Sequence, residues 1–253
     1  MLKNIHIEDI KNIALKAGNA IMEIYNKEFQ IEYKDNKSPL TEADLKSNEI
    51  ICSSLQNLYQ NIHIVSEENR QTDYKIRKNW EYYWCIDPID GTKEFIKKNN
   101  EFTVNIALIH KDTPVLGVVY APAIDEMYSA KQGDGAFLNG QRLPLKINKN
   151  TKNSINIVAS KSHLSDETKK FIDNLTSNIK HSTLISKGSS LKLCMVATGE
   201  ADMYPRLAPT MEWDTAAADA IVRCVGKMTY QYDSGKPLKY NKKDLLNPWF
   251  IVR

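Results

Sequence analysis

The 253-residue sequence contains only four cysteines, and they lie too far apart to form a cysteine-based scaffold. Cys52, Cys85, Cys194 and Cys224 form no Cys-x-x-Cys pair. Small disulfide frameworks and zinc sites depend on regularly spaced cysteines, so neither is expected. We therefore expect reduced thiols, as in a cytoplasmic protein, with Cys85 packed in the interior.

Long apolar runs and a strong excess of either charge are also missing. No run of 18 apolar residues occurs, and the N-terminal segment has no apolar core of the signal-peptide kind. The 34 Lys and Arg residues nearly balance the 31 Asp and Glu residues, and the lysines are spread along the chain. These absences predict a cytoplasmic protein without integral membrane contact and without a nucleic-acid polymer as partner. A small anionic ligand is compatible with this charge.

The first half of the chain is expected to combine helices with an antiparallel sheet. Apolar residues recur every three or four positions in two N-terminal segments, which predicts helices over 10–24 and 41–58 before any strand. Strand patterns follow over 61–68 and 82–86, and then as an antiparallel meander over 102–145. The first half is therefore expected to be α+β.

The second half alternates strand and helix patterns, which is typical of an α/β arrangement. It is separated from the first half by a polar stretch without periodicity at 146–153. We expect residues 1–150 to form an α+β metal-binding domain with an antiparallel sheet. Residues 151–253 are expected to form an α/β domain for substrate recognition, which makes the fold class α/β as a whole.

The segment "DPIDGT" places two carboxylates at the expected end of a buried strand. Pro88 fixes a backbone angle and Gly91 permits a sharp turn, so Asp87, Asp90 and the carbonyl of Ile89 can point into one cavity. These ligands are all oxygen atoms, which suit Mg²⁺, Mn²⁺ or Ca²⁺ better than zinc or copper. The segment therefore predicts a site for a hard divalent cation.

Two further carboxylates fall at comparable positions in the expected fold. Glu67 ends the strand pattern of "VSEEN", and Asp214 lies near the start of the helix pattern in "EWDTAAADAI". Each has an ordinary alternative, because aspartates often cap helices and Glu67 with Glu68 could be a solvated pair. Gathered with Asp87 and Asp90, however, these charges would repel one another without divalent cations. Clustering therefore predicts metal binding.

These motifs, in this order, closely resemble the inositol monophosphatase superfamily of Mg²⁺-dependent, lithium-sensitive phosphatases. The resemblance implies a layered αβαβα sandwich of the inositol monophosphatase and sugar phosphatase type. Over nearly the whole chain it is similar to the bacterial 3′(2′),5′-bisphosphate nucleotidase branch, which implies hydrolysis of adenosine 3′,5′-bisphosphate to AMP and phosphate in sulfate assimilation. That branch also implies a cytoplasmic enzyme, some of whose relatives are peripheral at the inner membrane. The segments that carry the branch-level resemblance are "KSPLTEAD", "DGTKEFIKKNNEFTVNIALI", "LGVVYAPAIDEMYSA", "KGSSLKLC" and "MYPRLAPTMEWDTAAADAI".

The resemblance implies a division of labour among the metal ligands. One cation is expected on Glu67, Asp87 and the Ile89 carbonyl, and a second on Asp87, Asp90 and Asp214. The isoleucine is often leucine in the family, but only its carbonyl is used. The expected cofactor is Mg²⁺, two or three per site, with Mn²⁺ as a substitute and with Li⁺ and Ca²⁺ as inhibitors.

The resemblance also implies the residues that act on water and substrate. Asp44 and Thr92, with Glu67, match the group that polarises the attacking water, although Asp44 would equally complete a capping box with Thr41. The free N–H groups of a helix that begins at "GTKEFI" would add an anion site. For Lys192 and for the lone histidine after a strand, a solvated role is the alternative. The expected substrate contacts are Gly91, Thr92, Ser189, Lys192, Arg206, Asp214 and His163.

Other functions stay open at this point. The same chemistry on an inositol or sugar monophosphate is the nearer alternative, and a catalytically silent phosphate-binding regulator is a second. Haloacid-dehalogenase-type phosphatases carry D-x-D-G-T, with one residue fewer between the two aspartates than the interval found here. The partner is expected to be a small nucleotide bisphosphate, and the sequence leaves open whether the protein is a monomer or a homodimer.

Overall fold

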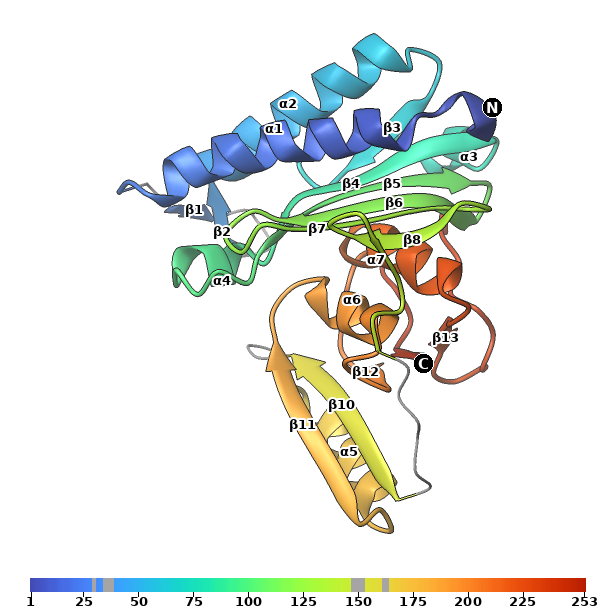
Figure 1. Ribbon diagram of the computed structural model, residues 1–253. Coiled ribbons are helices and arrows are strands. Elements are labelled where there is room, and N and C mark those ends of the chain that lie inside the picture. The colour runs from blue at the N-terminus through green and yellow to red at the C-terminus, as the bar shows by residue number, and fades with distance from the viewer. Residues whose placement is uncertain (29–30, 34–38, 147–152, 161–163) are drawn as a thin grey trace.

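The computed structural model describes residues 1–28, 31–33, 39–146, 153–160 and 164–253. Its largest sheet has seven strands in the order β3-β4-β5-β6-β7-β8-β9 (Figure 1). β3 and β4 are parallel, and every other neighbouring pair in this sheet is antiparallel. The strands are β3 (His63–Ser66), β4 (Tyr82–Asp90), β5 (Thr103–His110), β6 (Thr113–Ala121), β7 (Glu126–Lys131), β8 (Gly135–Leu138) and β9 (Gln141–Arg142).

Helices cover both faces of this sheet (Figure 1). α1 (Ile7–Tyr25) and α2 (Glu42–Leu58) lie on one face, and α6 (Leu191–Thr198) and α7 (Glu212–Cys224) lie on the other. The alternation of β4 explains the two cores, since Trp84 and Ile86 pack with α1 and α2 whereas Tyr83 and Cys85 pack with α6 and α7. The expected antiparallel meander is confirmed, and so is the burial of Cys85. All four cysteines are free thiols.

Two short strands correct the expectation that both N-terminal helices precede any strand. β1 (Ile31–Tyr33) and β2 (Pro39–Thr41) lie between α1 and α2 and pair antiparallel. Each has three residues, which is too short to show the alternation that identifies a strand in a sequence.

The remaining elements form a further layer beneath α6 and α7 (Figure 1). β10 (Ser154–Ser160) and β11 (His181–Lys187) are parallel, with α5 (Asp166–Thr176) beside them, and β12 (Tyr204–Arg206), β14 (Phe250–Val252) and β13 (Thr229–Gln231) form a three-stranded antiparallel sheet. Three short helices complete the order: η1 (Leu2–Asn4), α3 (Tyr74–Arg77) and α4 (Thr92–Ile96). Helices and sheets thus alternate in layers. The expected boundary near residue 150 falls on 147–152, outside the described residues, and the division into two domains stays a prediction.

α7 lies unusually close to the large sheet. A Cβ atom added to Gly117 on β6 would come within 2.1 Å of the Ala217 carbonyl oxygen of α7, so only glycine fits there. This contact sets the height of α7, and of Asp214 on its first turn, above the sheet. Within the described part of the chain, no helix is long and apolar enough to span a bilayer.

Candidate active site and metal centre

A β-bulge in β4 brings Asp87 and Asp90 to the same face of the sheet. Residues three apart on a regular strand point to opposite faces. Here Asp87 pairs with Asn105 and Asp90 with Thr103, so three steps on β4 face two steps on β5. The extra residue returns Asp90 to the face of Asp87, Tyr83 and Cys85, which is the face covered by α7. β4 therefore does not end at Ile86, as the strand pattern over 82–86 predicted, but continues through the bulge to Asp90.

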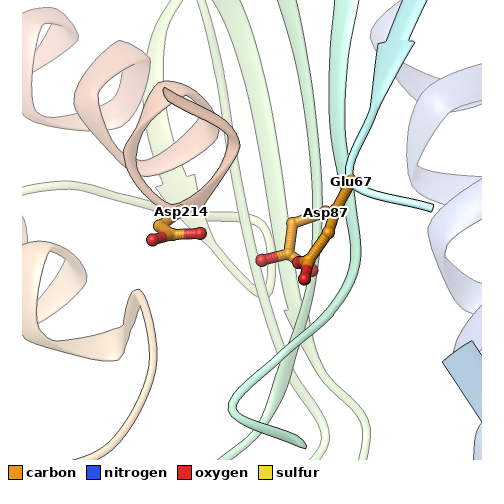
Figure 2. Close-up of side chains that lie close together, drawn as sticks. All are labelled: Glu67, Asp87 and Asp214. Atoms are coloured by element: carbon orange, nitrogen blue, oxygen red, sulfur yellow. The ribbon is translucent and has the colours of Figure 1, made fainter. Parts of the chain in front are cut away.

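Three carboxylates from separate elements converge beside this bulge. Glu67 follows β3, Asp87 lies on β4, and Asp214 lies in the first turn of α7. One carboxylate oxygen of each lies within 4.8 Å of the others. Figure 2 shows Glu67 and Asp87 side by side, with Asp214 facing them from α7. Parallel pairing of β3 with β4 fixes this geometry, since the Glu67 N–H donates to the Ile86 carbonyl at 3.2 Å.

The electrostatics of the cluster are unfavourable for carboxylates without a counter-charge. Burial, then the charges of Glu67 and Asp90, raise the pKa of Asp87 well above its ordinary value. Burial and the charge of Asp90 raise the pKa of Asp214 likewise, although the Met211 N–H donates to its Oδ2 at 2.8 Å. Like charges held this close become stable as anions only when a cation or a proton is shared among them. The cluster therefore favours a divalent cation.

Asp90 lies next to both the metal cluster and the cationic side of the site. Burial raises its pKa to about 6, while Lys192 and the donated N–H of Ser190 act in the opposite direction. The Ile89 carbonyl accepts from the Thr92 hydroxyl at 3.4 Å, and the Ile89 N–H donates to Asp87 Oδ1 at 3.1 Å. Ile89 thus contacts Asp87 through its N–H and Thr92 through its carbonyl.

Asp44 occupies the position that both of its expected roles require. Its Oδ2 accepts from the Thr41 N–H at 2.8 Å and from the Thr41 hydroxyl at 2.6 Å, which confirms the capping box at the start of α2. Its Oδ1 accepts from the Thr92 hydroxyl at 3.3 Å. Thr92 lines the cavity, and Asp44 is buried behind it. One carboxylate therefore caps a helix and also contacts the candidate water-activating hydroxyl.

A cavity of about 310 Å³ opens beside the carboxylates and carries the cationic residues. Lys192 on α6 is 6% exposed, and its Nζ donates to the Ser189 carbonyl and lies 5.6 Å from the centre of the Tyr204 ring. Burial lowers the pKa of Lys192 to about 8, while the charge of Asp90 counteracts this. Arg206 on β12 donates to the Pro209 carbonyl at 3.0 Å. The cavity therefore carries both the acidic cluster and two basic side chains, Lys192 and Arg206.

The expected site residues among the described positions gather around this one cavity, with Asp44 behind Thr92. Gly91 has φ 94°, the left-handed conformation that the "DGT" turn was expected to need, and α4 begins at the next residue. His163 lies outside the described residues, so its expected contact stays a prediction. The expected residues that line the cavity are Glu67, Asp87, Ile89, Asp90, Gly91, Thr92, Ser189, Lys192, Arg206 and Asp214.

Sequence reasoning missed several residues of the cavity wall. Glu94 is buried beside Lys192, and Gly188 packs so closely that an added Cβ would lie 2.9 Å from Glu94 Cγ. Tyr204 provides an aromatic wall. All three belong to segments that the resemblance had selected, "GTKEF", "KGSSLK" and "MYPRL", but only contacts in three dimensions distinguish them from ordinary packing residues.

A buried carboxylate fixes the start of α7. Glu212 is fully buried and accepts from the Asn241 N–H at 2.7 Å, the Lys242 N–H at 2.9 Å and Lys242 Nζ at 2.6 Å. Asn247 Nδ2 also donates to the Met211 carbonyl at 2.7 Å. These bonds hold the turn that presents Asp214, because they tie it to the segment 241–247. Glu212 is therefore a structural partner of the metal centre that the sequence did not reveal.

The residues of the cluster fit a hard divalent cation. Each candidate ligand is a carboxylate or carbonyl oxygen, and burial together with neighbouring negative charges raises the pKa of at least two of the carboxylates, Asp87 and Asp214. Nitrogen and sulfur donors of the kind preferred by zinc or copper do not belong to this cluster of described residues. The donor set thus agrees with Mg²⁺ or Mn²⁺.

Comparison with known proteins gives a consistent result. The model of the inositol monophosphatase family matches residues 2–249. The 3′(2′),5′-bisphosphate nucleotidase CysQ of Escherichia coli (strain K12) is 41% identical over 249 residues, which are 97% of this chain and 98% of that protein. The crystal structure of CysQ from Bacteroides thetaiotaomicron matches with a TM-score of 0.87 at 43% identity, and covers 97% of this chain and 96% of that one. An IMPase of Thermotoga maritima matches with a TM-score of 0.79 at 25% identity, over 96% and 89% of the two chains.

These matches confirm the layered α/β sandwich that was expected, and they span both halves of the chain. They also remove the haloacid-dehalogenase alternative, which would require a different fold around its D-x-D motif. The bulge gives the physical reason, because the three-residue interval aligns two metal-binding carboxylates only on a bulged strand. By sequence, by fold and by the acidic site at the bulge, this chain belongs to the inositol monophosphatase family.

Proposed function

We propose that this protein is a 3′(2′),5′-bisphosphate nucleotidase that hydrolyses adenosine 3′,5′-bisphosphate to AMP and phosphate. One observation carries the proposal: a single cavity is lined both by carboxylates for divalent cations and by the basic side chains of Lys192 and Arg206. A substrate with two phosphates has one group for the carboxylate-bound cations and one for the basic side chains. The curated relatives bear the name of this activity over nearly the full length of this chain.

The carboxylate cluster and its cations are proposed to hold the phosphate that is cleaved. Glu67, Asp87, Ile89, Asp90 and Asp214 are the proposed ligands of two Mg²⁺ ions, with a third bound more weakly. When bound, Mg²⁺ supplies positive charge to the phosphoryl oxygens and acidifies a coordinated water. The chain's own contribution is to hold five oxygen ligands on three separate elements at a fixed spacing.

Thr92 and Asp44 are proposed to direct the attacking water. The Thr92 hydroxyl donates its proton to Asp44 Oδ1 at 3.3 Å, so its oxygen is left as an acceptor that faces the cavity. A water that donates to this oxygen, with Glu67 as its second acceptor, is oriented for attack on phosphorus. Because Asp44 is fixed by its bonds to Thr41, its Oδ1 stays in place as an acceptor for the Thr92 hydroxyl, whose other acceptor, the Ile89 carbonyl at 3.4 Å, is itself a proposed metal ligand.

The two basic side chains of the cavity are proposed to hold the phosphate that is not cleaved. Lys192 and Arg206 supply the charge, and the Tyr204 ring provides a flat surface next to them. His163 stays a further proposed contact. Charge-assisted bonds from lysine and arginine suit a phosphate dianion better than the neutral hydroxyl groups of an inositol ring.

The proposal is tested by measuring phosphate release from adenosine 3′,5′-bisphosphate, AMP, inositol 1-phosphate and fructose 1,6-bisphosphate at millimolar Mg²⁺. The expected result is a clear preference in kcat/KM for the nucleotide bisphosphate. Equal or greater activity on inositol 1-phosphate or a sugar phosphate would identify the monophosphatase alternative instead. Absence of hydrolysis of all four compounds would support a silent phosphate-binding protein.

Two further properties belong to the same proposal. Mn²⁺ is expected to replace Mg²⁺, and Li⁺ and Ca²⁺ are expected to inhibit, since Li⁺ supplies too little charge and Ca²⁺ accepts a looser geometry. Inhibition by Li⁺ but not by Na⁺ or K⁺ is the expected pattern in the same assay. We also propose a cytoplasmic location, a role in sulfate assimilation and a small-molecule substrate as the principal partner.

A further inference from the structure

A group of buried hydroxyl and amide side chains connects α6 to the metal-bearing sheet. Ser190, Thr103 and Asn105 are each at most 1% exposed. The Ser190 hydroxyl lies 2.9 Å from Thr103 Oγ1 and donates to Asn105 Oδ1 at 2.9 Å. None of the three lines the cavity among the described residues, so their positions are not explained by contact with a substrate.

The side-chain bonds of Ser190 reach the strand that pairs with the two aspartates of the metal centre. Thr103 and Asn105, which bind its hydroxyl, are the register partners of Asp90 and Asp87 across the β-bulge. Ser190 therefore joins α6 to β5 at the two positions that pair with the metal-bearing residues of β4.

On its other side, Ser190 fixes the segment that recognises the substrate. It is the N-cap residue of α6, and Lys192 follows two positions later. Ser189 before it has φ 47°, a conformation that costs free energy for a residue other than glycine. Such a conformation persists only when its surroundings hold it, and Ser190 together with the Glu101 carboxylate, which accepts from the Gly188 N–H at 3.0 Å, provides this restraint.

We propose that Ser190 is a positioning residue that couples divalent-metal binding at Asp90 to nucleotide recognition by Lys192. The proposal rests on the function proposed above and adds a link between the metal-binding carboxylates and the basic side chains of the cavity. A cation that draws the Asp87 and Asp90 carboxylates toward itself shifts the bulge of β4, and with it the paired residues Asn105 and Thr103 that bind the Ser190 hydroxyl. The hydroxyl contacts with β5 keep Ser190 in register, so α6 and Lys192 are set in place together with the metal ligand. Coupling of this kind is reciprocal, so a nucleotide that orders α6 must also tighten metal binding.

The test measures Mn²⁺ binding by the electron paramagnetic resonance of free Mn²⁺, with and without AMP, and corrects for the Mn²⁺ that AMP binds alone. Ser190→Ala removes the hydroxyl and keeps the N–H. Thr103→Val removes one partner of that hydroxyl at nearly constant shape, whereas Thr103→Ser keeps it. Thr198→Val is the matched control, because Thr198 is also 1% exposed and lies at the other end of α6, where its hydroxyl donates to the Met195 carbonyl and accepts from the Glu200 N–H at 3.4 Å, both within three residues of it.

For the wild-type protein we expect AMP to increase Mn²⁺ affinity. Ser190→Ala should weaken Mn²⁺ binding without AMP and reduce the AMP effect by about three- to tenfold, the range for loss of one or two hydrogen bonds. Thr103→Val should show a smaller reduction, and Thr103→Ser and Thr198→Val should behave like the wild type. The double variant Ser190→Ala with Thr103→Val should be no worse than Ser190→Ala, because both changes break the same link.

Two negative results separate this proposal from the proposed function. If Ser190→Ala keeps wild-type Mn²⁺ affinity and a wild-type AMP effect, or if Thr198→Val is equally impaired, Ser190 has no positioning role. If the wild-type protein binds Mn²⁺ but not AMP, the nucleotidase function fails. In that case the Mn²⁺ titrations without AMP still decide whether Ser190 positions Asp90, since unchanged affinity in Ser190→Ala would overturn it. Thermal unfolding of each variant identifies loss of fold, and Thr103→Val provides the comparison if Ser190→Ala does not fold.

Discussion

At the scale of single residues, Asp87 is the carboxylate with the most acidic surroundings. Its pKa is raised by burial and by four neighbouring carboxylates, Glu67, Asp90, Asp214 and Asp44. It is also the residue proposed to contact both cations. Asp87 is therefore expected to matter greatly for activity and to reduce the stability of the metal-free fold.

Asp87→Asn should lower kcat for adenosine 3′,5′-bisphosphate by roughly 10²- to 10³-fold at millimolar Mg²⁺, as is typical when a main electrostatic contribution is removed. The metal-free variant should also unfold at a higher temperature than the metal-free wild type, because one buried charge is gone. Phosphate release and thermal unfolding measure the two effects. Asp112→Asn, in an exposed ion pair with Lys239, is the control and should change neither. Near-normal turnover of Asp87→Asn would contradict the two-metal assignment.

Lys192 and Arg206 should determine which phosphate ester is preferred. Lys192→Met and Arg206→Met each should raise KM for adenosine 3′,5′-bisphosphate by about tenfold or more, which corresponds to loss of a hydrogen bond to a charged group. KM for inositol 1-phosphate should change much less, because that substrate has no second phosphate. Lys236→Met, at an exposed position, is the control. Equal losses on both substrates would mean that these residues do not recognise the nucleotide.

The residues that could be predicted from the sequence are those whose chemistry is unusual where they stand. Carboxylates at the ends of buried segments indicate a cation, and for this reason Glu67, Asp87, Asp90 and Asp214 were identified from the sequence. Ser190, Glu94 and Glu212 escaped notice, since serine before a helix and glutamate within one are ordinary there. The partners of Ser190, Thr103 and Asn105, lie more than 80 residues away from it in the chain. Such partners leave no local pattern.

At the scale of elements, the position of α7 depends on a buried ion pair. Glu212 is fully buried, whereas the Lys242 side chain is 25% exposed. Removal of one partner from a buried pair leaves a charge or several N–H donors unsatisfied. The first turn of α7 is therefore expected to be held mainly from the segment 241–247.

Glu212→Ala should lower the free energy of unfolding by about 3 kcal/mol, the lower end of the range for breaking a buried pair, because Lys242 can reach solvent. Urea denaturation measures this change. Glu49→Ala, in an exposed pair with Lys46 on α2, is the matched control and should cost less than about 1 kcal/mol. A loss for Glu212→Ala no larger than that of the control would show that other contacts hold α7.

The elements themselves were predictable to different degrees. Long periodic segments gave α1, α2 and the antiparallel meander, whereas the three-residue strands β1 and β2 were missed. The strand pattern over 82–86 was expected to end at Ile86, but β4 continues through Asp87 to Asp90. A bulge depends on the pairing of two strands, so the sequence of β4 alone does not specify it.

At the scale of the whole molecule, the acidic cluster should make stability depend on pH and on metal. Asp90 has its pKa raised from 3.8 to about 6, and the pKa values of Asp87 and Asp214 are raised as well. The folded protein therefore retains protons that the unfolded chain releases. The corresponding stability is present below about pH 4 and is lost as the pH rises through about 6 and beyond.

Without divalent cations, the Tm of the wild-type protein should thus fall between pH 4.5 and pH 7.5. This fall should exceed that of Asp87→Asn by at least about 5 °C. Addition of 5 mM Mg²⁺ should abolish this difference at pH 7.5 and have little effect at pH 4.5, because cations and protons compete for the same oxygens. Differential scanning calorimetry with and without a chelator measures both. A Mg²⁺ effect of equal size at both pH values would contradict the proposed cluster.

The absence of a side chain at Gly117 has a consequence for how the enzyme can change over evolutionary time. The Ala217 carbonyl lies where a Cβ would be, at 2.1 Å, so even the smallest substitution must move α7 outward by about 1 Å to reach normal contact. Gly117→Ala should therefore shift Asp214 relative to Asp87 and reduce metal affinity and kcat, although residue 117 does not line the cavity. Gly133→Ala is the control: its φ of 95° strains an alanine and should cost stability, but no atom lies within 4 Å of the added Cβ, so metal affinity and kcat should not change. The spacing of the metal ligands thus depends on Gly117, a residue that a comparison of cavity-lining residues would not select. Adaptation to a larger or smaller cation is therefore restricted at β6 as much as at the carboxylates.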